Sequence, residues 1–311
     1  MNGWPRVEPA GVTAAVRPPA VAGAFYPAEP GLLGALTDEL LEEAGRLART
    51  ADLLDRPVDQ PPLGLLIPHA GLVYSGVVAA AGLRLVGTTW PDTPLTVVIL
   101  GTNHGAAWLA GVASWGAGAW RTPFGDVRVD AELAGAILEL GAPFILDRKA
   151  HFGEHSIEVQ LPLLQVIAPQ ARIVPLTVAT GTGQGAIEAG AALGELLARR
   201  RAAGQRVVLA ISSDMAHYPA SRTCAQVTDD LLPLIQGVDP WALAATEHAL
   251  LERAVPGLVC GMCGIEPAVL GLAALRALGA TRGVRLAAAT SADAGGPSDR
   301  TVGYLAVGFS A

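Results

Sequence analysis

Three short apolar runs along the chain each stop at a polar segment that carries a histidine. The runs lie at 63–67, 95–101 and 207–211, and the histidines that follow them are His69, His104 and His217. A bounded apolar run of roughly four to eight residues is typical of a buried strand. Ligands of an open α/β sheet bind outside the carboxyl ends of its strands. We therefore expect the three histidines to converge at one edge of a sheet.

Helical periodicity separates these strands. It predicts helices over 30–49, 75–86, 130–140, 156–167, 221–236, 239–254 and 264–278, and a long helix that ends near 201. Further strands are expected at 172–178, 284–291 and 301–309, and a short meander at 111–130. This alternation predicts an α/β fold with a mainly parallel mixed β-sheet flanked by helices. We expect one domain over residues 21–311, preceded by a flexible N-terminal arm at residues 1–20.

Composition and charge exclude several classes of protein. Hydrophobic residues make up 51% of the 311 residues and charged residues 16%, which suits a sheet covered on both faces. With a net charge of −7 and no basic stripe, binding to nucleic acid is not expected. No apolar run reaches the roughly 18 residues needed to span a membrane, and the first twenty residues do not resemble a signal peptide. We therefore expect a cytoplasmic protein.

The three cysteines are too few for a disulfide framework. Cys260 and Cys263 form a C-x-x-C, which is compatible with a redox pair, with half of a zinc site, or with one functional cysteine beside an incidental neighbour. Cys263 directly precedes the predicted helix at 264–278, and the positive end of a helix favours a thiolate. Cys263 is therefore a candidate metal ligand or nucleophile.

Three histidines at strand ends and an available thiol predict a metal site, and these donors suit zinc, iron or copper. The segment 151–155 (HFGEH) matches the H-x-x-E-H pattern of inverted zinc peptidases, but Gly153 argues against the helix which that motif needs. We expect instead that His155 and Glu158 line the mouth of the site. Asp214 is expected to orient or charge a neighbouring group, because no G-x-S-x-G elbow supports a serine hydrolase. The GTGQGA of 181–186 is interpreted as a tight connection, so no dinucleotide cofactor is expected.

With these residues in view, the chain resembles the Memo family, whose prokaryotic form is known as AmmeMemoRadiSam system protein B. The matching blocks are VAGAFYP, IPHAGLVYSG, ILGTNHG, WRTPFGDVRVD, EHSIEVQLPLL, ISSDMAHY, MCGIEP and the closing SAD and VGY. That family is similar in fold to the class III extradiol dioxygenases. The resemblance implies that His69, His104 and Cys263 hold the metal, and that His217 stands at the position of the acid/base histidine. It also implies a functional link to radical-SAM and AMMECR-like proteins.

These observations lead to one functional hypothesis and two alternatives. The hypothesis is a dioxygenase-like oxidoreductase with one metal ion, iron(II) as the first candidate and copper or zinc as others. In it, His217 is the general acid/base, and Asp214, His155 and Glu158 form the polar surroundings. Cys263 differs from the carboxylate ligand of the dioxygenases, so a non-catalytic metal- or peptide-binding module is the first alternative. A zinc hydrolase with the same ligands is the second.

Overall fold

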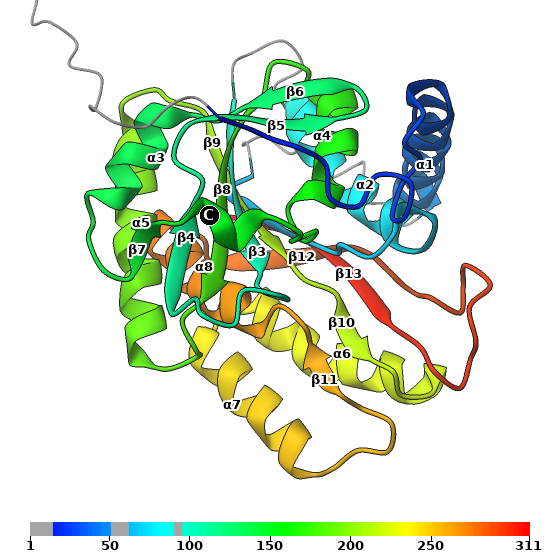
Figure 1. Ribbon diagram of the computed structural model, residues 1–311. Coiled ribbons are helices and arrows are strands. Elements are labelled where there is room, and N and C mark those ends of the chain that lie inside the picture. The colour runs from blue at the N-terminus through cyan, green and yellow to red at the C-terminus, as the bar shows by residue number, and fades with distance from the viewer. Residues whose placement is uncertain (1–14, 51–61, 90–94) are drawn as a thin grey trace, which may run out of the picture.

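The computed structural model describes residues 15–50, 62–89 and 95–311. Its centre is an eight-stranded sheet in the order β12-β13-β2-β9-β3-β8-β4-β7 (Figure 1). The strands of this sheet are β2 (Gly64–Ile67), β3 (Thr96–Thr102), β4 (Gly111–Ser114), β7 (Phe144–Leu146), β8 (Arg172–Ala179), β9 (Val207–Ser212), β12 (Arg282–Thr290) and β13 (Gly303–Ser310). The four central strands, β2, β9, β3 and β8, run parallel to one another. The predicted α/β fold with a mainly parallel mixed sheet is therefore confirmed.

The strands that precede the candidate histidines are buried throughout. Every residue of β2, β3 and β9 is buried, as expected for strands covered on both faces. Antiparallel pairing occurs on both sides of this parallel centre, where β13 pairs with β2 and with β12, and β4 pairs with β8. The parallel order places the ends of β2, β9 and β3 side by side at one edge.

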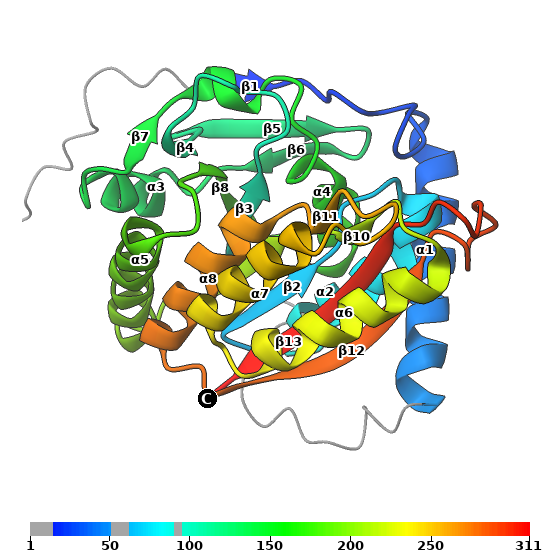
Figure 2. The ribbon, with the colours of Figure 1, turned by 90° about the horizontal axis from the view of Figure 1, so that it is seen from below.

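Helices cover both faces of the sheet. They are α1 (Pro30–Thr50), α2 (Leu72–Thr89), α3 (Ala131–Leu138), α4 (Leu161–Ile167), α5 (Gln184–Ala202), α6 (Ser221–Gln236), α7 (Pro240–Glu252) and α8 (Ile265–Leu278). Figure 2 shows α5, α8, α7 and α6 in a row across one face, and α2 behind the sheet. Helix α2 begins three residues earlier than predicted, because the Gly71 carbonyl already accepts from the amides of Tyr74 and Ser75. Within the described ranges, no helix is long and apolar enough to cross a bilayer.

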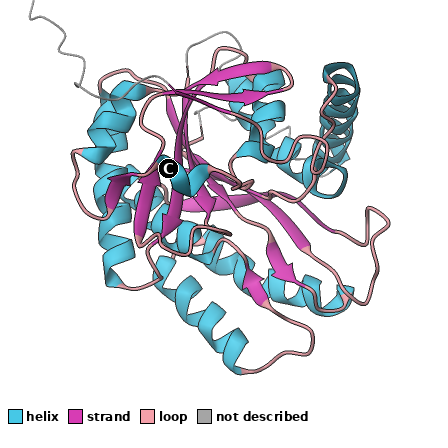
Figure 3. Ribbon diagram, in the orientation of Figure 1, coloured by secondary structure: helices cyan, strands magenta, loops and turns pink. Residues whose placement is uncertain are grey.

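Part of the predicted meander forms a separate small sheet. Strand β5 (Gly118–Thr122) pairs with β6 (Gly125–Arg128) as a hairpin, whereas β4 joins the main sheet (Figure 3). The third strand of the small sheet is β1 (Ala15–Arg17), which runs parallel to β5. Of the predicted arm at residues 1–20, residues 1–14 lie outside the described part. Its remainder begins with β1, and the Arg17 side chain is buried in an ion pair with Glu158.

A further two-stranded sheet, formed by β10 (Met215–His217) and β11 (Cys260–Met262), was not predicted from the sequence. Its antiparallel register pairs Met215 with Met262 and His217 with Cys260. The pairing brings the C-x-x-C segment beside the segment that follows β9. Strands of only three residues depend on their partner for stability, so the local sequence gives little signal for them.

The contact between α5 and α8 depends on glycine. A Cβ atom added at Gly194 would collide with the carbonyl oxygen of Ala274. We expect Gly194→Ala to lower the free energy of unfolding by about 1–3 kcal/mol, because the two helix backbones must separate. The matched control is Gly185→Ala in the first turn of α5, where the added Cβ meets no described atom within 4 Å apart from its chain neighbours and the backbone of its own helix. Urea unfolding checks both variants, and equal stabilities would contradict the close-packing argument.

Candidate metal centre

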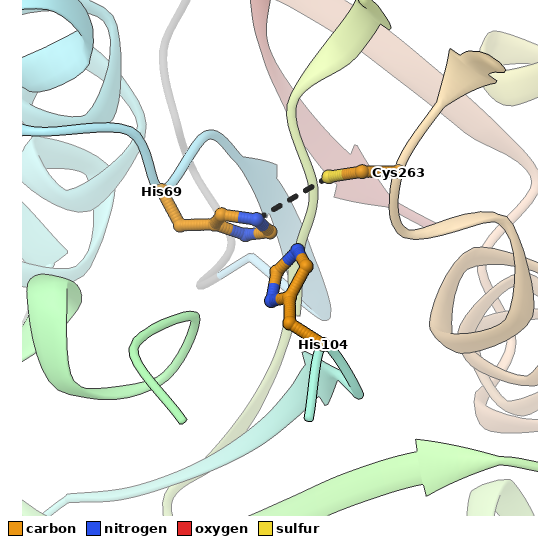
Figure 4. A group of neighbouring side chains, drawn as sticks. All are labelled: His69, His104 and Cys263. Atoms are coloured by element: carbon orange, nitrogen blue, oxygen red, sulfur yellow. Dashed lines mark hydrogen bonds between the residues drawn. The ribbon is translucent and has the colours of Figure 1, made fainter. Parts of the chain in front are cut away.

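Three of the predicted donors meet at the edge where β2 and β3 end. His69 follows β2, His104 follows β3, and Cys263 lies in the turn between β11 and α8. One donor atom from each lies within 4.8 Å of the other two (Figure 4). The sulfur of Cys263 is 3.3 Å from Nε2 of His69, although 194 residues separate them in the chain. The structure therefore brings together the three side chains that the family resemblance named as ligands.

The hydrogen bonds of His69 fix which ring nitrogen faces the centre. The Ser212 hydroxyl donates its proton to the Ser156 carbonyl oxygen at 2.6 Å, so it accepts from Nδ1 of His69 at 3.0 Å. Nε2 then carries the lone pair and faces the Cys263 sulfur. Burial lowers the pKa of His69 well below its usual value, and the neighbouring histidines act in the same direction. The ring is therefore neutral, which is the form that binds metals.

His104 is oriented by Glu154, a residue that the sequence analysis did not select. Nδ1 of His104 lies 3.0 Å from one carboxylate oxygen, and the His104 amide donates to the other at 2.7 Å. Burial opposes ionisation of Glu154, but these hydrogen bonds and that of the Ser156 amide hold its pKa well below the usual range. Because the carboxylate accepts the Nδ1 proton, Nε2 of His104 is free to bind a metal. Carboxylate–histidine pairs of this kind commonly support metal ligands.

The environment of Cys263 differs from the one predicted from its position. Cys263 does directly precede the N-terminus of α8, but burial raises the pKa of its thiol well above the usual value, and the charge of Asp214 adds to the effect. Without a bound cation, burial therefore outweighs the stabilisation that the helix end was expected to give the thiolate. A bound metal ion reverses this balance, because its charge favours the thiolate.

Asp214 and His217 lie next to these donors. One oxygen of Asp214 accepts from the amides of His69 and Ala70 at 2.7 and 3.2 Å, and the other is 4.0 Å from Nε2 of His217. Burial raises the pKa of Asp214 to about 7, against the opposing effect of these two amides. Burial also lowers the pKa of His217 to about 4. His217 is therefore neutral at pH 7 and able to accept a proton, and among the described residues its buried Nε2 has no hydrogen-bond partner.

A pocket of about 530 Å³ opens in front of this group. Its polar lining comes from His104, His155, Asp214, His217 and Cys263, and its aromatic lining from Phe25, Tyr74, Tyr218 and Tyr304. His155 lines the pocket as expected and stacks on the ring of His104, with centroids 4.5 Å apart. Burial lowers the pKa of His155 to about 4, and the neighbouring His104 acts in the same direction. The pocket thus combines the neutral imidazoles of His155 and His217 with an aromatic wall.

Glu158, in contrast, does not line the pocket, and its predicted place at the mouth of the site is wrong. The carboxylate is fully buried. It accepts from the Arg17 guanidinium and the Tyr26 hydroxyl, both at 2.5 Å, and from the amides of Ala20 and Val21 at 2.8 and 3.0 Å. These four donors use the whole hydrogen-bonding capacity of a carboxylate. Glu158 therefore fixes the N-terminal segment instead of facing a ligand.

The HFGEH segment is not an inverted zinc-peptidase helix. A 3₁₀ turn, Arg148–His151, ends at its first histidine, whose Nδ1 hydrogen-bonds to Thr177 at 3.1 Å, away from the pocket. The glutamate of this motif is Glu154, which supports His104. Two residues of the motif, Glu154 and His155, therefore lie beside the candidate centre, and Glu154 contacts it through His104, which lies 50 residues earlier in the chain.

The donor set suits a metal ion that accepts nitrogen and sulfur. Two imidazoles present Nε2 and one half-buried cysteine presents its sulfur, and zinc, iron and copper bind such donors. The Cys263 thiol donates to Nε2 of His69 in the absence of a cation, and a metal bound by both atoms would replace that proton. The residues present therefore fit a single metal ion.

Comparison with known proteins shows which family the chain belongs to. A family model described as Memo-like protein matches residues 17–308. A MEMO1 family protein of Methanopyrus kandleri is 35% identical over 294 residues, which cover 94% of this chain and 98% of the relative. A MEMO1 family protein of Aquifex aeolicus is 33% identical over 298 residues, with 94% and 99% covered. One of Methanocaldococcus jannaschii is 34% identical over 299 residues, with 93% and 97% covered. The chain belongs to the Memo-like protein family.

Proposed function

We propose that this protein is a metal-dependent oxidoreductase that uses one redox-active metal ion, iron(II) first and copper second. His69, His104 and Cys263 are its ligands in this proposal. The observation that carries it is the hydrogen bonding of the two histidines. Ser212 and Glu154 hold both Nδ1 atoms, so both Nε2 atoms are available beside the Cys263 sulfur. The protein would supply only three donors, so a bound metal would keep coordination positions free for other ligands, as in metal sites that bind substrate and O₂.

The bound metal would supply activation of O₂ and of a substrate hydroxyl. The remaining tasks fall to residues around the pocket. His217, neutral at pH 7, accepts a proton from the substrate hydroxyl and returns it later in the cycle. Asp214 holds the loop of His69 through two amides and lies beside His217. The aromatic side chains of Phe25, Tyr74 and Tyr304 provide an apolar wall that limits water in the pocket.

The test is O₂ consumption by protein reconstituted anaerobically with Fe(II), Cu(I) or Zn(II), assayed against a panel of phenolic and peptide substrates. Consumption with iron or copper, and none with zinc or metal-free protein, supports the proposal. Tight binding of metal without O₂ uptake for any substrate would favour a metal- or peptide-binding module. Turnover with zinc under anaerobic conditions would favour a hydrolase. In this proposal the protein acts in the cytoplasm, in functional connection with radical-SAM and AMMECR-like proteins.

A further inference from the structure

We propose that Arg17 is a positioning residue for the metal ligand His104, and that docking of the N-terminal segment is thereby coupled to metal binding. The inference rests on the proposed role of His104 as a ligand. It concerns a side chain on β1 that does not line the pocket and that acts through the loop carrying Glu154 and His155.

Arg17 holds this loop by its backbone. The guanidinium donates from Nε to the His151 carbonyl oxygen at 2.8 Å and from Nη2 to the Glu154 carbonyl oxygen at 2.5 Å. Its Nη1 pairs with Glu158 at 2.5 Å, and its face lies 4.1 Å from the ring centroid of Trp120. The Arg17 residue is fully buried. A rigid planar fork that makes two directed hydrogen bonds to the loop restrains it more tightly than a single contact could.

The restrained loop is the one that orients His104. Arg17 binds the backbone carbonyl of Glu154, and the side chain of the same Glu154 accepts from the ring and the amide of His104. One oxygen of that carboxylate also accepts from the amides of His155 and Ser156, both at 2.8 Å. A displacement of the loop would therefore move the carboxylate and the imidazole together. Glu154 is therefore the single residue through which Arg17 is connected to His104.

The N-terminal segment also reaches the other histidine ligand. The carbonyl of Phe25 accepts from the amide of Leu72 at 2.8 Å, in the turn that follows His69. The ring of Phe25 packs on His155 with a centroid distance of 4.7 Å and lines the pocket. Residues 17–25 thus contact the loop that follows His69 and the loop that holds Glu154, the residue that supports His104. By thermodynamic linkage, a segment that stabilises the liganding geometry must itself be stabilised when metal binds.

The competing explanation is that Arg17 only neutralises the buried Glu158. That explanation predicts a loss of stability without a change in metal affinity, and Tyr26→Phe is a suitable control for it. This variant removes the Tyr26 hydrogen bond to the same carboxylate but leaves the bonds of Arg17 to the loop. Arg17→Lys keeps a positive charge for Glu158 and loses the planar fork, so it tests the bonds to the loop.

The first experiment measures Zn(II) affinity of the full chain by competition with a chromophoric chelator. We expect Arg17→Lys to bind about tenfold more weakly, at the lower end of the roughly 10- to 100-fold range for residues that support ligands. Tyr26→Phe should bind like wild type, and Glu154→Gln should show a loss at least as large as Arg17→Lys. Histidine ¹⁵N spectra of the metal-free Arg17→Lys protein should also show mixed tautomers for His104, which a purely structural role would not produce.

A second measurement needs no variant. Hydrogen exchange of the wild-type protein should slow at the amides of Ala20 and Val21 on addition of Zn(II), whereas α3 serves as an unaffected reference. Wild-type affinity and an unchanged His104 spectrum in Arg17→Lys would overturn the proposal, as would unchanged exchange at Ala20 and Val21 beside slowed exchange at Leu72. A wrong assignment of the metal site itself gives a different result. In that case His69→Ala would bind zinc with the same affinity as wild type.

Discussion

Cys263→Ser is expected to abolish stable metal binding. The serine hydroxyl does not ionise near neutral pH and is a hard donor, so it cannot replace a thiolate beside two imidazoles. We expect the affinity to fall beyond the roughly 10- to 100-fold range seen for residues that only support ligands. Metal content by mass spectrometry of anaerobically purified protein checks this. Wild type should carry about one iron or copper ion per chain, and the variant almost none.

The matched control is Cys260→Ser in the same C-x-x-C segment. Cys260 lies on β11 opposite His217, and it belongs to none of the donor groups formed by the described residues. The Cys260→Ser variant should retain the metal, whereas His69→Ala should lose it as Cys263→Ser does. If Cys263→Ser keeps one metal ion per chain, the assignment of the thiolate as a ligand is wrong. A loss in Cys260→Ser alone would move the sulfur ligand to the other cysteine.

His217→Ala is expected to keep the metal and to lose turnover. His217 lies in the pocket beside Asp214 and is not part of the His69, His104 and Cys263 donor group. Removing a general acid/base slows a reaction by about 10²- to 10⁴-fold, and we expect a loss in that range for O₂ uptake with any substrate found in the screen. The measurement combines metal content with initial rates of O₂ consumption.

His248→Ala provides the control for this experiment, because His248 is an exposed histidine on α7, away from the pocket. It should match wild type in both metal content and rate. Two results would contradict the assigned role: loss of metal in His217→Ala, which would make His217 a ligand, or turnover at the wild-type rate. The Asp214, His217 and Cys263 donors also lie within 4.8 Å of one another, so metal content must be measured in every variant.

The sequence predicted those parts of the site that depend on strand ends. The apolar runs before His69, His104 and His217 are buried strands, and their parallel order brings the polar segments together. Such runs can be recognised locally, because burial on both faces requires a continuous apolar stretch. The same reasoning located α8 and hence the position of Cys263.

The parts that sequence could not predict depend on contacts between distant segments. Glu154 gains its role from His104, which is 50 residues away, and Arg17 from a loop that is 134 residues away. Glu158 was placed in the site because it follows His155 in the first turn of a helix. Its carboxylate instead accepts hydrogen bonds from Arg17 and Tyr26. The local sequence around Glu158 does not show that these two residues lie nearby. The strands β10 and β11 are each too short to be recognised without the other.

The position of β2 between β9 and β13 has a consequence for biosynthesis. The strand that carries His69 has as its two neighbours Val207–Ser212 and Gly303–Ser310, which both follow it at a long distance in the chain. A nascent chain on the ribosome therefore has His69 and His104 exposed long before the partners of β2 have been synthesised. Cys263 is also synthesised late. If His69, His104 and Cys263 are the ligands, we expect stable metal binding only once the chain has been made as far as β13, and proteolytic fragments that lack this strand should not retain a metal ion.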